Sequence, residues 1–220
     1  MVSRTDLEQN RRRSDLWLVG ADGAGLRRLT SHEAGDSEPR WAPDGRSILF
    51  LSSRSGSTQV WRIAADGGEA EPVTRLPLEV GTFRISPDGS RLVLAMQVFP
   101  GTGPEETAKR LAATEERERS GPSGRLYQGL FVRHWDEWCD GRRSHLFVVP
   151  LAGGAAVDLM PDLDADCPSR PFGGAEEFAV SPDGNTVVFS ARDAGRGEAW
   201  STNFDLFEAP LDGSRAPRRL

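Results

Sequence analysis

The segment from Phe131 to His145 carries the densest set of aromatic and ionisable side chains in the sequence. Imidazole, carboxylate and thiolate groups of this kind can bind a metal ion. The candidate ligands His134, Asp136, Cys139 and His145 are separated by two, three and six positions, which matches no standard zinc spacing. A Cys–His nucleophile pair is equally disfavoured, because no oxyanion-stabilising group accompanies it. We therefore expect no metal, no cofactor and no catalytic residue here.

Two interpretations of this segment remain. In the first, Trp135 and Trp138 pack on the underlying sheet while the charged side chains form salt bridges. In the second, Arg133, His134 and Asp136 line a path for substrate.

A sequence repeat predicts the elements that position this segment. The motif Pro-Asp-Gly begins at Pro43, Pro87 and Pro182, in steps of 44 and 95 residues. A second series, in which a polar residue precedes two apolar ones, begins at Asp15, Gln59, His145 and Asp205. A period of about 40–50 residues is typical of one four-stranded β-propeller blade.

Each repeat also contains four short runs with strand character. Residues 47–52 are rich in branched apolar side chains, and Asp66-Gly67-Gly68 predicts a hairpin turn. The predicted fold class is all-β: a partial β-propeller of four-stranded antiparallel blades, spanning 1–220. The expected parts are a half blade at 14–31 and complete blades at 37–75, 81–160 and 176–220.

The 95-residue step contains an insert at 99–143 and a long loop at 161–175. Within the insert, residues 105–119 predict a polar helix with Glu115 and Arg119 as an i,i+4 pair. Long insertions between strands are often functional or disordered. Because an incomplete ring exposes sheet edges, we expect the chain to be a segment of a longer protein.

Composition argues against several classes of partner. The net charge is −6 and no basic tract could follow a phosphate backbone, so nucleic acid is not expected. No apolar run approaches the ~20 residues of a membrane span.

Cys139 and Cys167 could form one disulfide or remain free thiols. No signal peptide is apparent, and the compartment stays open between the cytoplasm and the periplasm.

Several motifs together resemble one family. The Pro-Asp-Gly blades are similar to PD40/TolB-like repeats. The segment Arg133-His134-Trp135-Asp136 with Trp138, and the loop from Asp166 to Glu177, resemble bacterial dipeptidyl aminopeptidase and acylaminoacyl-peptidase members of the prolyl oligopeptidase family. So does the opening from Thr5 to Trp17, and the resemblance covers nearly the whole chain.

The resemblance implies that this chain is the non-catalytic propeller of a serine peptidase that also has an α/β-hydrolase domain. In such enzymes the propeller admits short peptides, and propeller carboxylates can hold the free amino terminus of the substrate. Glu176 and Glu177 are the pair implied for that role, since carboxylates accept the N–H donors of an ammonium group. The alternative is that both glutamates are merely solvated.

Two other functions stay open from the sequence. One is a TolB-like propeller that binds protein partners, and the other is a propeller that is itself a lyase or a glycosidase. The three functions differ in whether a hydrolase segment with a G-x-S-x-G nucleophile elbow follows in the same polypeptide.

The sequence contains no G-x-S-x-G pattern, and its three histidines all lie in propeller context. The 220-residue chain should therefore not turn over dipeptidyl or aminoacyl chromogenic substrates, and a fluorophosphonate probe should label none of its serines. Intact-mass spectrometry after incubation with the probe measures this, and stoichiometric labelling would contradict the expectation.

Overall fold

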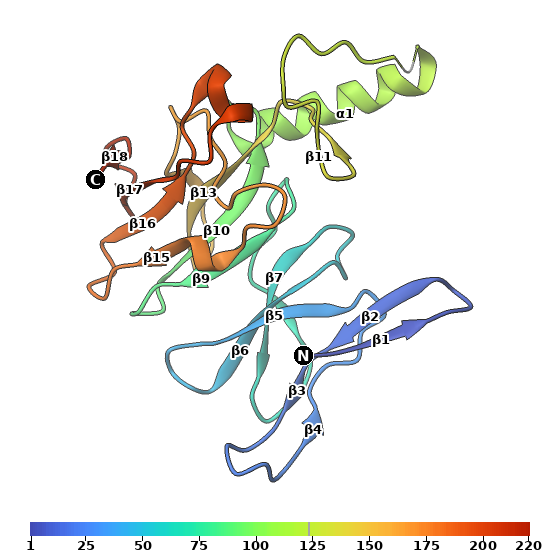
Figure 1. Ribbon diagram of the computed structural model, residues 1–220. Helices are drawn as coiled ribbons and strands as arrows, with labels where there is room; N and C mark the ends of the chain where they lie inside the picture. Colours follow the sequence, from blue (N-terminus) through green and yellow to red (C-terminus); the bar gives the residue numbers. More distant parts are fainter. Residues whose placement is uncertain (123) are drawn as a thin grey trace.

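The structure is a computed structural model that describes residues 1–122 and 124–220, and antiparallel β-sheets dominate it (Figure 1). Two small sheets open the chain: β1 (Val2–Asp6) with β2 (Arg11–Asp15), and β3 (Trp17–Leu18) with β4 (Arg27–Arg28). The first four-stranded sheet contains β5 (Asp36–Trp41), β6 (Ser47–Ser52), β7 (Gln59–Ala64) and β8 (Glu71–Pro72). The second contains β9 (Thr82–Ile85), β10 (Arg91–Val98), β13 (Arg143–Pro150) and β14 (Val157–Asp158). The third contains β15 (Phe178–Val180), β16 (Thr186–Ala191), β17 (Asp205–Pro210) and β18 (Arg218–Arg219).

Neighbouring sheets pack face to face through shared apolar clusters. In β6, Ile48 and Phe50 belong to a cluster with Leu16 of the β3–β4 unit, whereas Leu49 and Leu51 belong to a cluster with the second sheet. Strand β10 divides in the same way between its two neighbours. Because both faces of these strands are buried, their sequences are continuous apolar runs instead of alternating ones.

The Pro-Asp-Gly turns join the first two strands of each four-stranded sheet. The carboxylates of Asp44, Asp88 and Asp183 accept a hydrogen bond from the backbone N–H two positions later. The glycine that follows each aspartate has a positive φ of 65° to 73°, a conformation that other residues rarely adopt. The motif therefore recurs because each blade needs the same tight turn.

The polar residue at or near the start of the third strand of each blade is a repeated structural position. The Asp15 carboxylate accepts from Arg28 at 2.7 Å, and the Asp205 carboxylate pairs with Arg219 at 2.6 Å. In the first four-stranded sheet, Gln59 bonds to the Thr74 hydroxyl at 2.8 Å. His145 is the equivalent residue of the next blade, and this explains its position without a catalytic role.

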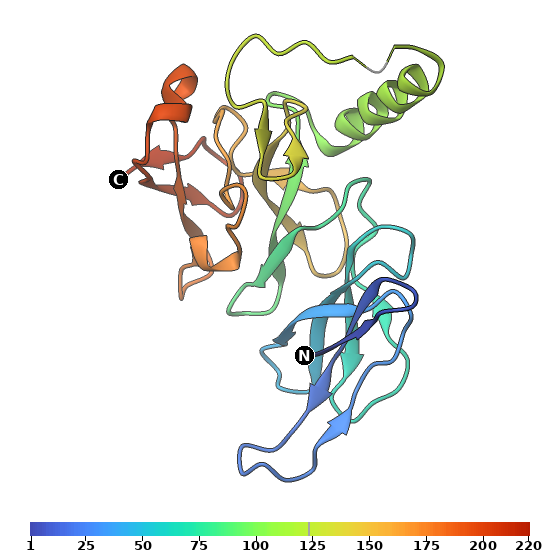
Figure 2. The same ribbon diagram turned by 45° about the vertical axis from the view of Figure 1, so that its right-hand side comes forward.

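The insert of the second four-stranded sheet extends from one end of that sheet. It contains α1 (Pro104–Ser120), which reaches out beyond the sheets, and a hairpin of β11 (Arg133–His134) and β12 (Glu137–Trp138) (Figures 1 and 2). Two short 3-10 helices, η1 (Ala175–Glu177) and η2 (Gly195–Trp200), belong to the third sheet and its approach. Helix α1 is anchored near its start, where Pro104 and Thr107 are buried.

The predicted fold class is confirmed: the described residues are mostly β, with three four-stranded antiparallel sheets, three two-stranded sheets, of which β3–β4 is the partial blade, and one α-helix. The helix predicted at 105–119 is observed at Pro104–Ser120. The β1–β2 hairpin was not anticipated, because its residues are polar and lack apolar alternation.

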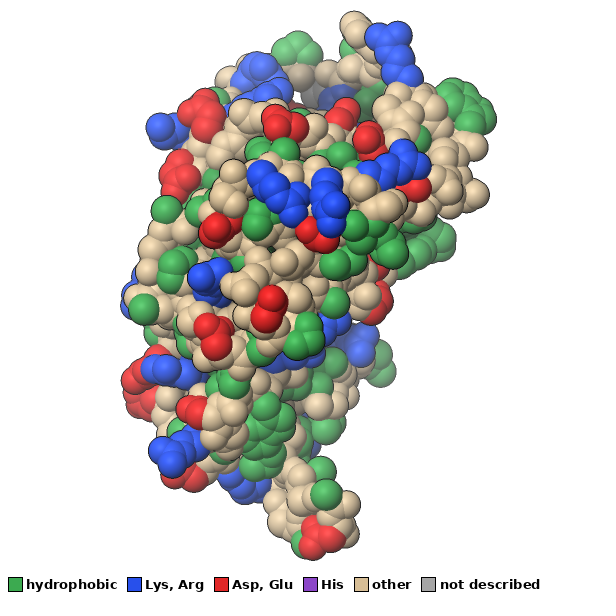
Figure 3. Space-filling model, turned by 90° about the vertical axis from the view of Figure 1, so that its left-hand side faces the viewer, with side chains coloured by type: hydrophobic (Ala, Val, Ile, Leu, Met, Phe, Trp, Pro, Cys, Tyr) green, Lys and Arg blue, Asp and Glu red, His purple; other side chains and the backbone are tan. Residues whose placement is uncertain are grey.

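Surface charge and hydrophobicity agree with the composition. Acidic and basic side chains are interspersed over the face drawn in Figure 3, which carries no broad basic surface. Among the described residues, no helix has the length and apolar character needed to cross a bilayer.

Thr74 provides a test of how the fourth strand is held. Its buried hydroxyl accepts from the Val60 N–H at 2.9 Å and donates to Gln59. Thr74→Val should lower the free energy of unfolding by about 1–3 kcal/mol, because it leaves a buried N–H without an acceptor. Urea unfolding measures this, with exposed Thr5→Val as the control. Equal midpoints for the two variants would show that the hydroxyl does not contribute.

Candidate functional site

Three segments that are distant in the sequence meet at one end of the second and third four-stranded sheets. Val98 at the end of β10 pairs with Arg143 at the start of β13, so the insert between them emerges at this end. Strand β16 ends here as well, where Ala191 pairs with Asp205, and η2 follows it. The loop at 161–175 contributes the third segment and leads into β15 through η1.

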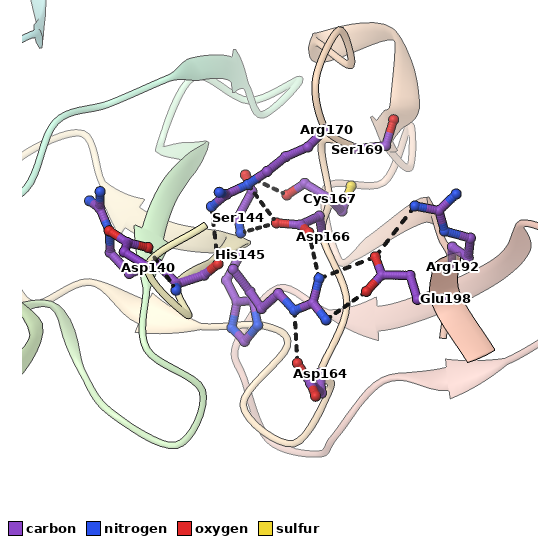
Figure 4. A network of polar contacts seen from close by, with 12 residues as sticks. Asp140, Ser144, His145, Asp164, Asp166, Cys167, Ser169, Arg170, Arg192 and Glu198 are labelled. Atoms are coloured by element: carbon purple, nitrogen blue, oxygen red, sulfur yellow. Dashed lines mark hydrogen bonds and ion pairs between the residues drawn. The ribbon is translucent and has the colours of Figure 1, made fainter. Parts of the chain in front are cut away.

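Arg143 is the centre of a largely buried ion-pair network at this end, with only its Asp164 partner mostly exposed (Figure 4). Its guanidinium donates to both carboxylate oxygens of Glu198, at 2.8 and 3.2 Å. It also donates to Asp166 at 3.0 Å and to Asp164 at 2.8 Å. One side chain of β13 thus connects the 161–175 loop with η2, which belongs to the neighbouring sheet.

Two further arginines complete the network (Figure 4). Arg170 donates to Asp166 at 3.1 Å, and Arg192 donates to Glu198 at 3.4 Å. Asp166 also accepts the backbone N–H of Ser144 at 2.7 Å. The three arginines and the three carboxylates balance in formal charge, so these groups offset one another and leave little net charge for a ligand.

The network affects protonation at its centre. Burial by itself lowers the pKa of Arg143, but the hydrogen bonds of Glu198 and Asp164 outweigh that cost and hold the pKa above its ordinary value. Arg143 is therefore a permanent cation. Its charge is what allows Asp166 and Glu198 to remain buried.

A small pocket lies against this network. Its lining is formed by His134, Asp166, Ser169, Arg170, Arg192, Glu198 and Phe204. Burial lowers the pKa of His134, an effect that nearby Asp166 partly opposes. The His134 imidazole is therefore neutral at pH 7 and can act as a hydrogen-bond donor or acceptor toward a bound group.

Aromatic side chains stand exposed around the pocket. Trp135 is 73% exposed and Trp138 is 58% exposed, so the interpretation in which they pack on the sheet is wrong. Trp135 instead meets Phe172 of the 161–175 loop in an edge-on contact, with 5.9 Å between ring centroids. Trp200 of η2 is also exposed, at 78%. The two tryptophans are exposed because the base of their hairpin lies over the polar network and not over an apolar surface. His134, at that base, lines the pocket beside the network.

The residues predicted to bind substrate lie at this end, but their environments differ. Arg133 lies over the ring of Trp138, at 5.9 Å from its centroid, and Asp136 is exposed at the turn of the hairpin. Glu176 is exposed as well. Glu177 is partly buried, and both of its carboxylate oxygens accept from Ser169.

The residues considered for metal binding are not brought together. His145 is buried on β13, with Nδ1 3.0 Å from Asp158 and Nε2 3.0 Å from the Leu163 carbonyl oxygen. In the described part of the chain no cluster of histidine, cysteine and carboxylate side chains could hold a metal ion. Both cysteines are free, and burial raises the pKa of the Cys139 and Cys167 thiols, which makes them weak nucleophiles.

Sequence reasoning identified none of the six network residues, which are Arg143, Arg170, Arg192, Asp164, Asp166 and Glu198. Arg143 and Glu198 are 55 positions apart, and neither belongs to a recognisable motif. One signal in the sequence could have pointed to the network. Arg143 lies next to the start of a predicted strand and Asp166 lies in the long loop, and both segments resemble the peptidase family.

Comparison with known proteins agrees with this architecture. A family model described as "TolB beta propeller domain" matches residues 5–103. Over this range the chain is therefore similar to a TolB-type β-propeller, in agreement with the blades observed there. A crystal structure of Pyrococcus horikoshii acylaminoacyl peptidase has the same fold over 99% of this chain, with a TM-score of 0.62 and 16% identity.

Sequence similarity relates this segment to a particular group of peptidases. It is 30% identical over 210 residues to dipeptidyl-peptidase 5 of Porphyromonas endodontalis, and 28% identical over 218 residues to that of Porphyromonas gingivalis. The matches cover 94% and 97% of this chain. The chain spans only 29% and 31% of the length of those proteins.

Removing the central cation tests the importance of the network. Arg143→Met should lower the free energy of unfolding by about 3 kcal/mol, because Asp166 and Glu198 stay buried with fewer partners. Arg119→Met is the control, since its pairs with Glu115 and Glu116 are exposed and contribute little. Chemical denaturation of the two variants measures the difference. A shift for Arg143→Met no larger than that of the control would show that the network does not stabilise this end.

Proposed function

We propose that this chain forms part of the substrate-binding wall of a prolyl oligopeptidase-family serine peptidase. In this role it limits access to short peptides and helps to hold their amino terminus. The α/β-hydrolase domain of the same polypeptide would carry the catalytic residues. The similarity to dipeptidyl-peptidase 5 supports this proposal, because those proteins are named for release of dipeptides.

The observation that carries the proposal is the distribution of charge at the end of the two sheets. The interior carboxylates Asp166 and Glu198 are neutralised by arginines. Glu176 and Asp136 are exposed at the same end, and in the described part of the chain neither makes an ion pair. These carboxylates are available for a ligand cation, and a peptide ammonium group presents three donors to them.

His134 and the exposed rings fit the same role. A neutral imidazole in the pocket wall can bond to a peptide amide without adding charge. Trp135 and Phe172 present apolar surface beside it. The insert and the 161–175 loop, which supply these groups, stand at the end of the sheets, where they would restrict access to a site facing them.

Charge removal at Glu176 and Asp136 tests the proposal in the full-length polypeptide. Glu176→Gln and Asp136→Asn should each lower kcat/KM by about 10–150-fold for dipeptidyl substrates with a free amino terminus, if the carboxylate is desolvated on binding. N-acylated substrates of the same sequence carry no ammonium charge and should change little. Glu79→Gln is the matched control, as that exposed glutamate lies in the connection between β8 and β9.

Equal losses on both kinds of substrate, or no loss on either, would contradict a role in binding the amino terminus. A second function, binding of a protein partner as in a TolB-like scaffold, is favoured by the exposure of Trp135, Phe172 and Trp200. That function predicts no effect of the carboxylate substitutions on turnover.

A further inference from the structure

Glu176 and Glu177 are adjacent in the sequence but have different surroundings. Glu176 is exposed, and in the described part of the chain its carboxylate has no hydrogen-bond partner. The Glu177 carboxylate accepts the backbone N–H of Ser169 at 2.7 Å through one oxygen and the Ser169 hydroxyl at 2.7 Å through the other. Both Glu177 oxygens are therefore already used by the 161–175 loop.

The loop is closed tightly around this contact. The Gly173 N–H donates to the Ser169 carbonyl oxygen at 2.8 Å, which completes a turn from 169 to 173. A Cβ atom at Gly173 would lie 2.5 Å from the Glu177 carboxylate and 2.5 Å from the Ser169 nitrogen. No side chain fits there, so the sequence requires glycine. We call Ser169, Gly173 and Glu177 the loop lock.

The loop lock borders the pocket. Ser169 and the next residue, Arg170, both line the pocket with His134. Arg170 is held in turn by Asp166 at 3.1 Å and by the Arg142 carbonyl oxygen at 3.1 Å. Phe172, at the tip of the same turn, contacts Trp135 of the hairpin. Releasing Ser169 would thus free one wall of the pocket and the aromatic contact above it.

We propose that Glu177 is a positioning residue and not a ligand of the substrate ammonium group. It fixes the 169–173 turn, and through it the pocket wall, while Glu176 alone of the pair faces the substrate. This inference rests on the proposed function for the role of Glu176. The loop lock itself is a property of the chain that can be measured without substrate.

The first measurement is amide hydrogen exchange of the 167–174 segment in the full-length polypeptide without substrate. Glu177→Gln keeps one acceptor oxygen for the Ser169 N–H but removes the negative charge, and its amide N–H can at most donate to the Ser169 hydroxyl, so the charge-assisted bonds are lost. Ser169→Ala removes the hydroxyl. Each variant should speed exchange of this segment by about 10-fold or more, because a charge-assisted bond is lost. The double variant should add little to Glu177→Gln.

Gly173→Ala disrupts the same lock by steric overlap and should show the same exchange pattern. Gly129→Ala is the matched control, since a Cβ there meets no atom within 4 Å. Glu79→Gln controls for removal of an exposed charge. Circular dichroism of each variant confirms that the sheets remain folded. Unchanged exchange in Glu177→Gln and Gly173→Ala would overturn the proposal.

The second measurement separates positioning from direct binding. Loosening of the pocket wall should raise KM for free-amino and N-acylated substrates alike, with kcat nearly unchanged, and Ser169→Ala should behave like Glu177→Gln. If Glu177 instead binds the ammonium group, Glu177→Gln will impair only free-amino substrates while Ser169→Ala has no effect, and the inference is wrong.

The two proposals fail in different ways. If Glu176→Gln has no effect on turnover but the exchange pattern of the loop lock is as expected, the amino-terminus role is wrong and the lock stands. If Glu176→Gln impairs free-amino substrates selectively but the exchange rates do not change, the amino-terminus role stands and the positioning role of Glu177 is wrong.

Discussion

Burial of β-strands on both faces is the constraint on which the rest of the structure depends. A single four-stranded sheet of this size cannot bury enough apolar surface alone, and each one is completed by its neighbours. Strands β6 and β10 each contribute alternate residues to two clusters. The relative placement of the sheets, and with it the place where their loops meet, follows from this shared packing.

The Arg143 network continues the contact between the second and third sheets at the end where apolar packing stops. Buried ion pairs contribute little net stability, because desolvation offsets much of their attraction. They do restrict geometry, since Asp166 and Glu198 are tolerated only in contact with their arginines. We infer that the network orders the loop, the hairpin and η2 relative to one another, and that its energetic effect appears mainly when one partner is removed.

Local sequence patterns were sufficient to predict the blades. Pro-Asp-Gly turns and continuous apolar runs report directly on backbone conformation and two-sided burial, and the observed strands follow them. The network could not be predicted in this way, because Arg143 and Glu198 meet only after two sheets have packed. The interpretation in which Trp135 packs on the sheet was wrong for a related reason. The surface beneath its hairpin is polar, and that polarity arises from residues contributed by two other segments.

The repeat also separates residues that the fold needs from residues that a site could use. His145 lies at the position occupied by Asp15, Gln59 and Asp205 in the other blades, and like them it bonds across to the fourth strand or the loop after it. Arg133, His134 and Asp136 have no counterpart in the repeat, since they come from the insert. A propeller blade can form without such an insert, as the 36–72 sheet does. The additional residues at this end therefore call for an explanation beyond folding, and the proposed role in substrate binding would account for their charge, exposure and common location.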